Sequence, residues 1–189
     1  MKGPVSQLKI VPLTPKWWPA FEDLLGQQGP CSRCWCMYWR IGPAYRKRSP
    51  TTNKAEFRAI VRKGFPPGLL ALDGEVAIGW CQLTPRDVLP WLDHARQFRQ
   101  IDDLRVWSIS CFYIRKGYRR RGVTGALIEA AIIAAKEAGA PALEAYPLDT
   151  ELTSSASFTG YMSTFRRAGF KVLVRYVSSR PIMRMDLKA

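Results

Sequence analysis

The chain has 189 residues, of which 47% are hydrophobic and 23% are charged. This length fits one domain spanning residues 1–189, and the apolar fraction excludes an intrinsically disordered chain. Lys and Arg number 29 against 15 Asp and Glu, and the resulting net charge of +14 favours an anionic partner such as nucleic acid, an acidic membrane surface or a phosphate-rich cofactor.

Composition also indicates the compartment. No apolar run approaches the roughly 20 residues that a membrane-spanning helix needs. The first residues, Met1 to Gln7, contain no apolar secretory core, so we expect no export. Five cysteines, an odd number in a chain long enough to build its own core, predict reduced thiols. We therefore expect a cytoplasmic protein without a membrane partner.

The N-terminal region predicts a short strand near residues 8–13, followed by a helix. Thr14-Pro15 is typical of a helix N-cap followed by proline in the first turn, and Gly26 ends the pattern. The apolar residues of this helix fall on one stripe, which indicates a face packed on a core. They are Trp17, Trp18, Phe21, Leu24 and Leu25.

A second helix and a hairpin follow. Asn53 is the expected capping residue of the helix, and Glu56 completes a capping box three residues later. The apolar runs 69–72 and 76–81 flank Asp73-Gly74, a dipeptide that supplies the positive φ angles of a tight hairpin. This pair of strands is therefore predicted to be antiparallel.

The C-terminal half alternates strands and helices. Residues 106–114 are rich in β-branched and aromatic side chains and predict a central strand, while 122–138 predict a largely buried helix. Further along, the pattern predicts a strand over 142–146, a short helix over 158–168 and strands near 171–177 and 182–187. The expected class is α/β (α+β), a mixed, mostly antiparallel sheet of about six to seven strands flanked by helices.

Between the central strand and the buried helix lies a basic loop that contains glycine. Backbone N–H groups of such a loop and of the first helical turn lack intrahelical partners and carry partial positive charge, so they bind phosphate groups well. Gly122 allows close approach of a ligand, and Arg119 to Arg121 add full charges. A solvated basic turn before an ordinary helix is the alternative.

At this loop the sequence resembles the GNAT superfamily of acetyl-CoA-dependent N-acetyltransferases. The family signature is Arg or Gln, two variable residues, Gly, one variable residue, then Gly or Ala. Arg119, Gly122 and Thr124 occupy these positions; Thr124 departs from the pattern, and Gly125 is adjacent. The segment 165–170 looks like the closing helix and Gly-Phe turn of the family, so the likeness covers residues 68–187 in order.

The resemblance implies acetyl-CoA as co-substrate and direct attack of a neutral amine on its thioester. In this family the fourth and fifth strands splay apart, and the pantetheine arm lies between them. The residues implied are Phe112, Tyr113 and Ile114 for the arm, and Arg119, Arg120, Arg121, Gly122, Val123, Thr124 and Gly125 for the pyrophosphate.

The reaction needs a base that removes a proton from the ammonium group of the acceptor. Glu144 is the first candidate, because a carboxylate in an otherwise apolar strand is costly unless it is used or paired. An ion pair with an arginine is the alternative role for this residue. Asp149 and Glu151 are alternative bases in the following loop.

An acid that protonates the leaving thiolate is helpful but not required, since water can supply the proton. Phe165 occupies the position of the usual tyrosine of the family and has no proton to give. Tyr161, one helical turn earlier, is therefore the expected acid, and Tyr146 is the second candidate.

Residues 27–52 form a Cys- and aromatic-rich insertion that the resemblance places on the acceptor side. Trp35, Tyr38 and Trp39 would line the acceptor site, with Asp103 as an acidic contact, although core packing is the alternative for each aromatic ring. Cys31, Cys34 and Cys36 could bind zinc with a fourth ligand from Cys81, Cys111 or His94. We expect no metal here but reduced thiols packed among aromatic rings.

The leading hypothesis is an enzyme that acetylates a small polar amine, such as an aminoglycoside-type antibiotic (and hence a role in antibiotic resistance) or an amino metabolite. A protein amine is the alternative acceptor. A non-catalytic nucleic-acid-binding or regulatory module that retains the fold is the alternative of a different class, but no RNP-type aromatic motif or zinc finger appears, so nucleic acid is not the expected partner. Coenzyme A is the expected partner, and a homodimer is compatible with the sequence.

Overall fold

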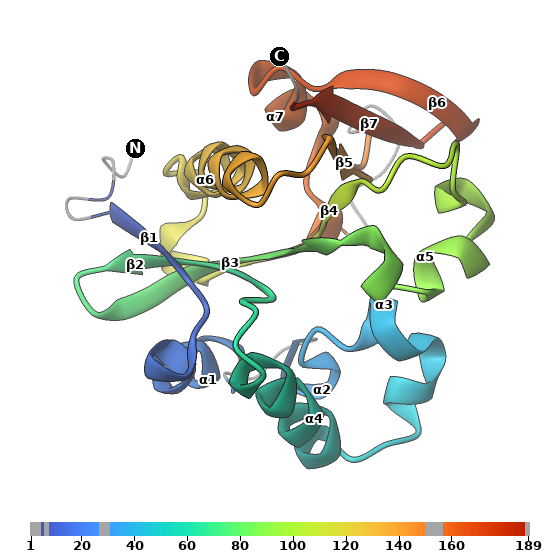
Figure 1. Ribbon diagram of the computed structural model, residues 1–189. Helices are drawn as coiled ribbons and strands as arrows, with labels where there is room; N and C mark the ends of the chain where they lie inside the picture. Colours follow the sequence, from blue (N-terminus) through green and yellow to red (C-terminus); the bar gives the residue numbers. More distant parts are fainter. Residues whose placement is uncertain (1–4, 6–7, 27–30, 150–156, 188–189) are drawn as a thin grey trace.

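The computed structural model describes residues 5, 8–26, 31–149 and 157–187. Its centre is a seven-stranded sheet in the order β1-β2-β3-β4-β5-β7-β6 (Figure 1). The strands are β1 (Leu8–Pro12), β2 (Gly68–Asp73), β3 (Val76–Pro85), β4 (Trp107–Ile114), β5 (Ala142–Ala145), β6 (Lys171–Val177) and β7 (Arg180–Asp186). The β4–β5 pair is parallel and the other pairs are antiparallel, which confirms the predicted fold class.

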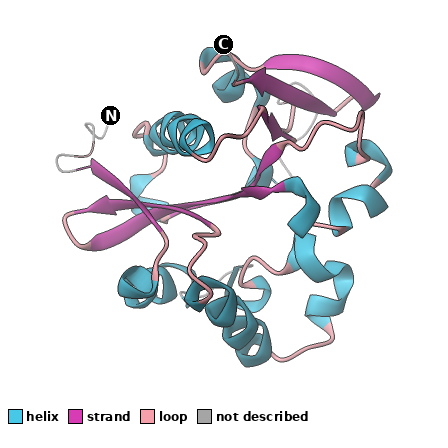
Figure 2. Cartoon of the chain, in the orientation of Figure 1, coloured by secondary structure: helices cyan, strands magenta, loops and turns pink. Residues whose placement is uncertain are grey.

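Helices cover both faces of the sheet (Figure 2). They are α1 (Trp18–Gly26), α2 (Cys31–Cys34), α3 (Tyr38–Ile41), α4 (Pro50–Arg62), α5 (Trp91–His94), α6 (Val123–Glu137) and α7 (Met162–Arg167). Short 3-10 turns are η1 (Pro15–Trp17), η2 (Gly42–Arg46), η3 (Arg86–Val88), η4 (Arg96–Phe98), η5 (Lys116–Tyr118) and η6 (Ser157–Thr159). In the view of Figure 1, α6 lies above the sheet and α1 and α4 lie below it.

Two apolar clusters hold these layers together. On the α6 face, Leu127 and Ile128 pack among side chains of the strands, which explains why this helix has so little polar surface. On the opposite face, Phe21 of α1 and Phe57 of α4 pack against Trp80 of β3, with ring centroids 4.8 and 6.1 Å from the indole. With both faces covered, the strands near the centre of the sheet have fixed positions.

The predicted hairpin is confirmed: β2 and β3 are antiparallel neighbours, and Gly74 at the turn has φ +60°. The pairing of β3 with β4 contains an irregularity that the sequence did not predict. Gln82 lies opposite Cys111 and Leu83 lies opposite Ile109, so Ser110 is an extra residue on β4. Such a bulge changes the direction in which neighbouring side chains and backbone groups point.

The capping prediction for the second helix was wrong. The helix α4 begins at Pro50, and its N-cap is Ser49, whose hydroxyl accepts a hydrogen bond from the backbone N–H of Thr52 at 3.1 Å. Asn53 lies inside the helix, fully buried, and its amide donates to the carbonyl oxygens of Arg33 and Tyr45. Ser49 followed by Pro50 fits the N-cap and first-turn preferences better than Asn53 followed by Lys54. The side chain of Asn53 instead binds the backbone of the segment that precedes the helix.

The predicted helix over 158–168 is shorter than expected. The α7 helix begins at Met162, and Tyr161 is its N-cap in an extended conformation. The preceding turn, η6, ends at Thr159. Gly160 separates the two elements, because its φ of +81° is left-handed backbone that cannot continue a right-handed helix. Glycine adopts this conformation more readily than other residues.

Candidate functional site

The central strands β4 and β5 pair over a short length and then separate. Their register runs only from Trp107 opposite Leu143 to Ile109 opposite Ala145. The β5 strand ends at Ala145, whereas β4 continues to Ile114. The predicted splay is therefore present, and it begins at the bulge residue Ser110. Beyond this point β4 keeps β3 as its neighbour on one side only.

The basic loop lies directly beyond the end of β4. Arg120 and Gly122 both have positive φ angles, +61° and +82°, and Gly122 is the N-cap of α6. The N–H of Ala126 is bonded to the carbonyl of Gly122 at 3.1 Å. Helical geometry therefore leaves the N–H groups of residues 123–125 without intrahelical acceptors, at the positive end of the helix dipole.

The surface of this helix start is open and basic. A Cβ atom added at Gly122 or at Gly125 would meet no other atom within 4 Å. Around it, Arg119 donates from Nε to the carbonyl oxygen of Ile114 at 3.2 Å, and the Arg121 guanidinium lies 5.1 Å from the centroid of the Tyr118 ring. Open backbone donors beside guanidinium groups fit the phosphate groups of a ligand.

The strand residues implied for the pantetheine arm lie next to this loop. Phe112 is buried and packs 6.1 Å from Phe165, while Tyr113 and Ile114 are half-buried. A Cβ atom on Gly160 would lie 3.3 Å from the Phe112 ring, so the segment before α7 packs directly on β4. The neighbouring residue Tyr161 is 38% exposed. The structure therefore brings Tyr161 close to the strand that is expected to hold the cofactor.

Glu144 lies on the opposite face of the sheet from α6, with 2% of its surface exposed. Arg184 donates to its Oε1 from two nitrogens, at 2.7 and 3.1 Å. The Tyr146 hydroxyl donates to its Oε2 at 3.1 Å, and Arg86 lies 3.9 Å from the same oxygen. Both carboxylate oxygens thus have partners, as the ion-pair alternative for this residue requires.

The hydroxyl of Tyr146 is the centre of a buried polar network. Arg86 donates to it at 2.8 Å, and Ser108 lies within hydrogen-bond distance at 2.8 Å. Burial, together with the nearby charge of Glu144, raises the pKa of Tyr146. With its proton directed at Glu144, this hydroxyl fits a structural role better than that of the acid.

The network also holds the insertion between β3 and β4. Arg86 forms an ion pair with Asp93 and donates to the carbonyl oxygen of Phe98 at 2.7 Å. Arg184 extends the network to Asp102, through contacts of 2.6 and 3.0 Å. The role of these two arginines was not predicted from the sequence. Each lies in a segment that is otherwise apolar or turn-like, and this was the sequence feature that could have indicated a buried partner for Glu144.

The alternative bases in the loop after β5 are placed differently. Asp149 forms an ion pair with Arg175 at 2.9 Å. Glu151 lies outside the described residues.

The predicted acceptor residues do not form one group. Trp35 is 4% exposed and packs in the core, 6.3 Å from Trp18. Trp39 is 3% exposed, and its Nε1 donates to the carbonyl oxygen of the bulge residue Ser110 at 3.0 Å. Tyr38 is half-buried, with its ring centroid 6.5 Å from that of Phe158.

Asp103 is exposed, in the insertion beyond Asp102. Of the predicted acceptor residues, Trp39 therefore touches the point of splay directly, and Tyr38 presents part of its ring to solvent beside it. Core packing accounts for Trp35.

The cysteines whose side chains the structure describes do not gather into a recognisable metal site. Within the described part of the chain, no group of three or more His, Cys, Asp or Glu residues could hold a metal ion. Cys34, Cys36, Cys81 and Cys111 are free thiols. Cys31 begins α2, but its side chain lies outside what the structure describes.

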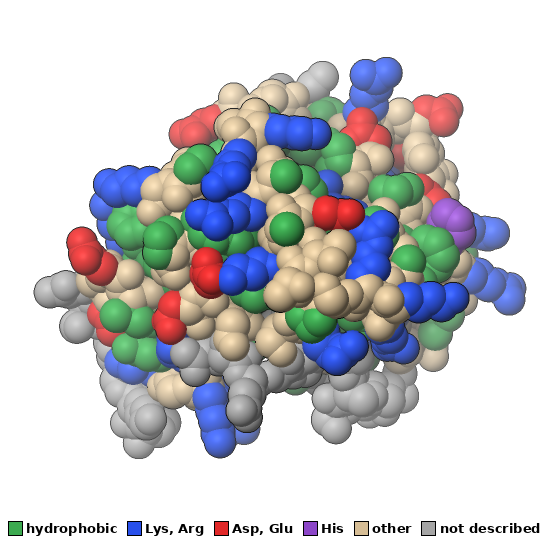
Figure 3. Space-filling view, turned by 90° about the horizontal axis from the view of Figure 1, so that it is seen from below, with side chains coloured by type: hydrophobic (Ala, Val, Ile, Leu, Met, Phe, Trp, Pro, Cys, Tyr) green, Lys and Arg blue, Asp and Glu red, His purple; other side chains and the backbone are tan. Residues whose placement is uncertain are grey.

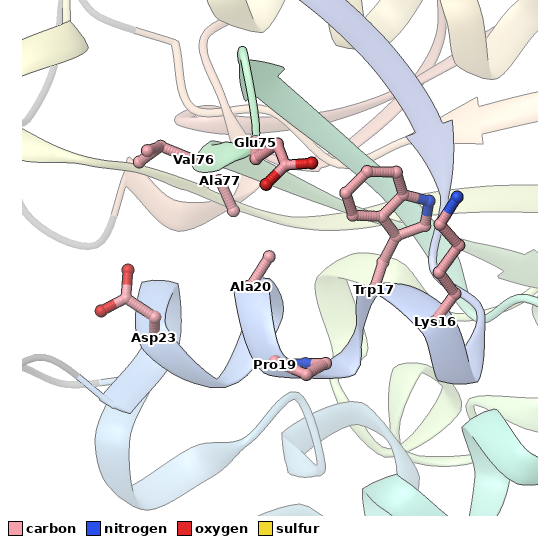
Figure 4. A pocket seen from close by; sticks show the side chains of 8 residues that line it. All are labelled: Lys16, Trp17, Pro19, Ala20, Asp23, Glu75, Val76 and Ala77. Carbon is pink, nitrogen blue, oxygen red and sulfur yellow. The ribbon is translucent and has the colours of Figure 1, made fainter.

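A surface hollow lies elsewhere, between α1 and the β2–β3 hairpin (Figure 4). Its lining residues include Trp17, Asp23 and Glu75, and none of the predicted site residues. An ion pair between Asp23 and Arg115 connects this hollow to the end of β4. Among the helices that the structure describes, none is long and apolar enough to cross a bilayer.

Comparisons with solved structures show the same fold. An N-acetyltransferase of Staphylococcus aureus Mu50 is 16% identical, with a TM-score of 0.57 over 97% of this chain and 100% of that one. The PaiA N-acetyltransferase of Thermoplasma acidophilum, solved in complex with coenzyme A, is 16% identical, with a TM-score of 0.55 over 95% and 99% of the two chains.

The ribosomal-protein-S18-alanine N-acetyltransferase of Escherichia coli is 12% identical, with a TM-score of 0.54 over 97% and 96%. No curated protein matches the sequence. The model of the acetyltransferase (GNAT) family matches residues 33–158, more than half of the chain. The chain therefore belongs to the GNAT family of acetyltransferases, which use acetyl-CoA as the acetyl donor.

Proposed function

We propose that this protein transfers the acetyl group of acetyl-CoA to the primary amine of a small polar acceptor, such as an aminoglycoside-type antibiotic or an amino metabolite. One observation carries the proposal: β4 separates from β5 and then leads, through an arginine-rich loop, into the open N-terminus of α6. This arrangement fits an extended ligand: the phosphate groups at one end would lie at the start of α6, and the rest of the ligand would lie along the separated part of β4.

The residues of the loop divide the work of binding. The N–H groups of residues 123–125 bind the pyrophosphate, and Gly122 permits its approach because no side chain stands in the way. Arg119, Arg120 and Arg121 add charge. The exposed backbone edge of Phe112 to Ile114 holds the pantetheine arm. Bound acetyl-CoA supplies the thioester carbonyl that the amine attacks.

We infer a positioning role for Glu144 rather than that of the base. Its burial and its contacts with Arg184 and Tyr146 stabilise the carboxylate where it is and leave no oxygen directed at an acceptor. The amine then loses its proton to water or to a group of the acceptor loops. The two roles predict different results for Glu144→Gln: a positioning role predicts a loss of stability, and a base role predicts a loss of turnover that is largest at low pH.

Replacing Tyr161 by phenylalanine is expected to lower kcat at least about tenfold without changing the affinity for coenzyme A. Tyr161 is 38% exposed beside β4, and its hydroxyl can donate a proton to the leaving thiolate, whereas removal of the hydroxyl leaves water as the donor. Steady-state kinetics with an accepted amine and calorimetric titration with coenzyme A measure the two quantities. Tyr176→Phe, which changes a tyrosine of the edge strand β6, is the control. Unchanged kcat in Tyr161→Phe would remove it from the mechanism.

The acceptor side supports an amine with a flat or ring-shaped part. Tyr38 and Phe158 present aromatic surface beside Trp39, which is fastened to β4. The exposed carboxylate of Asp103 lies in the neighbouring insertion and can attract a cation, whereas both oxygens of Asp102 accept from Arg184. The pKa of Asp102 is lowered by its hydrogen bond to Arg184, so it stays ionised.

Two alternative functions remain: an acetyltransferase with a protein amine as acceptor, and a nucleic-acid-binding module that catalyses no reaction. The Escherichia coli enzyme named above acts on ribosomal protein S18, which makes a protein amine the alternative acceptor. The basic excess alone supports a nucleic-acid-binding module without turnover. Figure 3 shows Lys and Arg side chains spread over the lower face with Asp and Glu between them, rather than gathered in one stripe. That arrangement favours the enzyme over the binding module.

A screen of amines decides among these functions. Purified protein is incubated with acetyl-CoA and a library of aminoglycosides, amino metabolites and short peptides, and free coenzyme A is followed by chromatography because the cysteines of the protein react with thiol reagents. We expect acetylated product with at least one small amine. Turnover with peptides only would establish the alternative acceptor. A salt-sensitive RNA shift without any transfer would contradict the enzyme hypothesis.

A further inference from the structure

Two cysteines that are far apart in the sequence meet beside the point of splay. Cys36 follows α2, and Cys111 lies on β4 immediately after the bulge residue Ser110. Cys111 packs against the buried cluster that contains Cys36. A hydrogen bond between the two thiols, followed by burial, raises the pKa of Cys36. Cys36 is 5% exposed and Cys111 is half-buried, so solvent reaches the pair from the side of Cys111.

Several hydrogen bonds fasten the Cys36 segment to the strand that carries Cys111. Gln82, which lies opposite Cys111 in the β3–β4 register, donates from Nε2 to the carbonyl oxygen of Cys36 at 3.2 Å. Its Oε1 accepts from the hydroxyl of Ser110 at 3.0 Å. Trp39 adds the bond from its Nε1 to the Ser110 carbonyl. These hydrogen bonds hold the segment of Cys36 against β3 and β4, and so keep the two cysteines close together.

The backbone at Cys36 is held in a conformation that L-residues rarely adopt. Trp35 has φ +47° and Cys36 has φ +58°, and neither is glycine. Left-handed backbone at two successive side-chain-bearing residues costs free energy and persists only where surrounding contacts enforce it. Here the indole of Trp80, on β3, donates to the Cys36 sulfur at 3.0 Å, and Cys36 is buried, so the sulfur lies in the interior of the protein.

We propose that Cys36 and Cys111 form a redox pair, a modification site that closes to a disulfide under peroxide and reopens under a thiol reductant. The pair joins the aromatic segment 36–39 covalently to β4 beside the predicted acceptor site. The inference concerns the thiols alone and holds whether or not an amine acceptor exists.

The chemistry balances with hydrogen peroxide as the oxidant. The Cys111 sulfur attacks one peroxide oxygen, the O–O bond breaks, and a sulfenic acid and one water result. The Cys36 sulfur then attacks the Cys111 sulfur, the S–OH bond breaks, and the proton of Cys36 leaves with the hydroxyl group as a second water. Two thiols and one peroxide thus give one disulfide and two waters, with both sulfur atoms oxidised and the peroxide reduced.

The other described cysteines are poorer partners. Cys81 is fully buried within β3, and burial, followed by the nearby Cys36, raises the pKa of its thiol. Burial likewise raises the pKa of Cys34 to about 11. The thiol of Cys36 is instead hydrogen-bonded with that of Cys111. The pKa of Cys36 is also raised, so contact with Cys111, and not the pKa, distinguishes Cys36 from the other two thiols. Because Cys111 is the more exposed member of the pair, it is the first site of attack.

Peptide mapping tests the pair directly. Purified full-length protein is treated with hydrogen peroxide, alkylated and digested with trypsin, which releases Cys34–Arg40 and Val106–Arg115 as separate peptides. We expect these two peptides linked, with a mass two hydrogens below their sum, and released by dithiothreitol. The variant Cys34→Ser leaves Cys36 as the sole cysteine of the first peptide, so the link in this variant assigns the sulfur.

Matched variants and a stability measurement complete the test. Cys81→Ser should retain the link, whereas Cys36→Ser and Cys111→Ala should lose it. Oxidation should also raise the Tm of the wild type by several degrees, because the bridge closes a long loop of the unfolded chain. A link between Val106–Arg115 and any peptide other than Cys34–Arg40, or conversion of Cys111 to sulfinic acid without a link, would overturn the proposal. The mapping of wild type decides the question even where a variant fails to fold.

Discussion

Replacing Gly122 by alanine is expected to weaken the binding of coenzyme A at least about tenfold, about 1.4 kcal/mol, while the protein stays folded. No atom lies within 4 Å of the position that the new Cβ would take, so the methyl group meets no steric clash, and the cost to the fold is the backbone strain at φ +82°. The methyl group instead occupies the surface that a pyrophosphate must approach to reach the amides of residues 123–125. Isothermal titration with coenzyme A measures the loss.

The other end of the same helix supplies the control. Gly139 has φ +72°, close to the +82° of Gly122, and an added Cβ there also meets nothing within 4 Å. Gly139→Ala therefore introduces the same kind of backbone strain, about 1 kcal/mol, away from the loop. We expect both variants to lose similar stability and only Gly122→Ala to lose affinity. Equal affinities in both variants and the wild type would show that the loop is not the binding site.

Replacing Glu144 by glutamine is expected to lower the stability of the protein by about 3 kcal/mol, since breaking a buried ion pair is costly. Among the described residues, Arg184 and Arg86 then keep only the more exposed carboxylates of Asp102 and Asp93. The Arg184 and Arg86 side chains are 11% and 7% exposed and would keep their charges beside a neutral amide. For a chain of this size the corresponding fall in Tm is about 6–12 °C. Thermal unfolding followed by circular dichroism measures it.

Arg184→Met, alone and combined with Glu144→Gln, separates the pair from its surroundings. If the carboxylate is a structural partner, the double variant should be more stable than the sum of the two single losses predicts. A base role predicts a different result. Turnover of Glu144→Gln would fall most at low pH, where the amine is protonated, and recover as the pH rises, while Tm and coenzyme A binding stay unchanged. That outcome would contradict the structural role proposed for Glu144.

The order of strands and helices could be read from the sequence because its signals are local. Asp73-Gly74 specifies a tight turn, and the apolar composition of 123–137 specifies a buried helix. The boundaries were less secure where two residues compete for one role. Ser49 and Asn53 are both good capping residues, and the adjacent Pro50 makes Ser49 the cap.

The candidate cofactor loop could also be found from sequence, since glycine and arginine act there through their own backbone freedom and charge. Contacts between distant segments could not. The two arginine partners of Glu144 come from β7 and from the turn after β3, so no spacing along the chain predicts them. The aromatic segment 35–39 is a similar case, because the core packing of Trp35 and the hydrogen bond from Trp39 to β4 depend on how α2 and α3 dock.

The amino-acid sequence by itself determined the family of this protein, the strand-loop-helix segment that faces phosphate groups and the direction of the hairpin, since each depends on residues close together in the chain. Tertiary structure alone decided which carboxylate is paired, which tyrosine is exposed and which two thiols are hydrogen-bonded. These properties arise where the sheet brings remote residues together in an environment of low polarity. An unpaired polar group is costly there, so the role of each buried polar group depends on the partners that the fold places beside it.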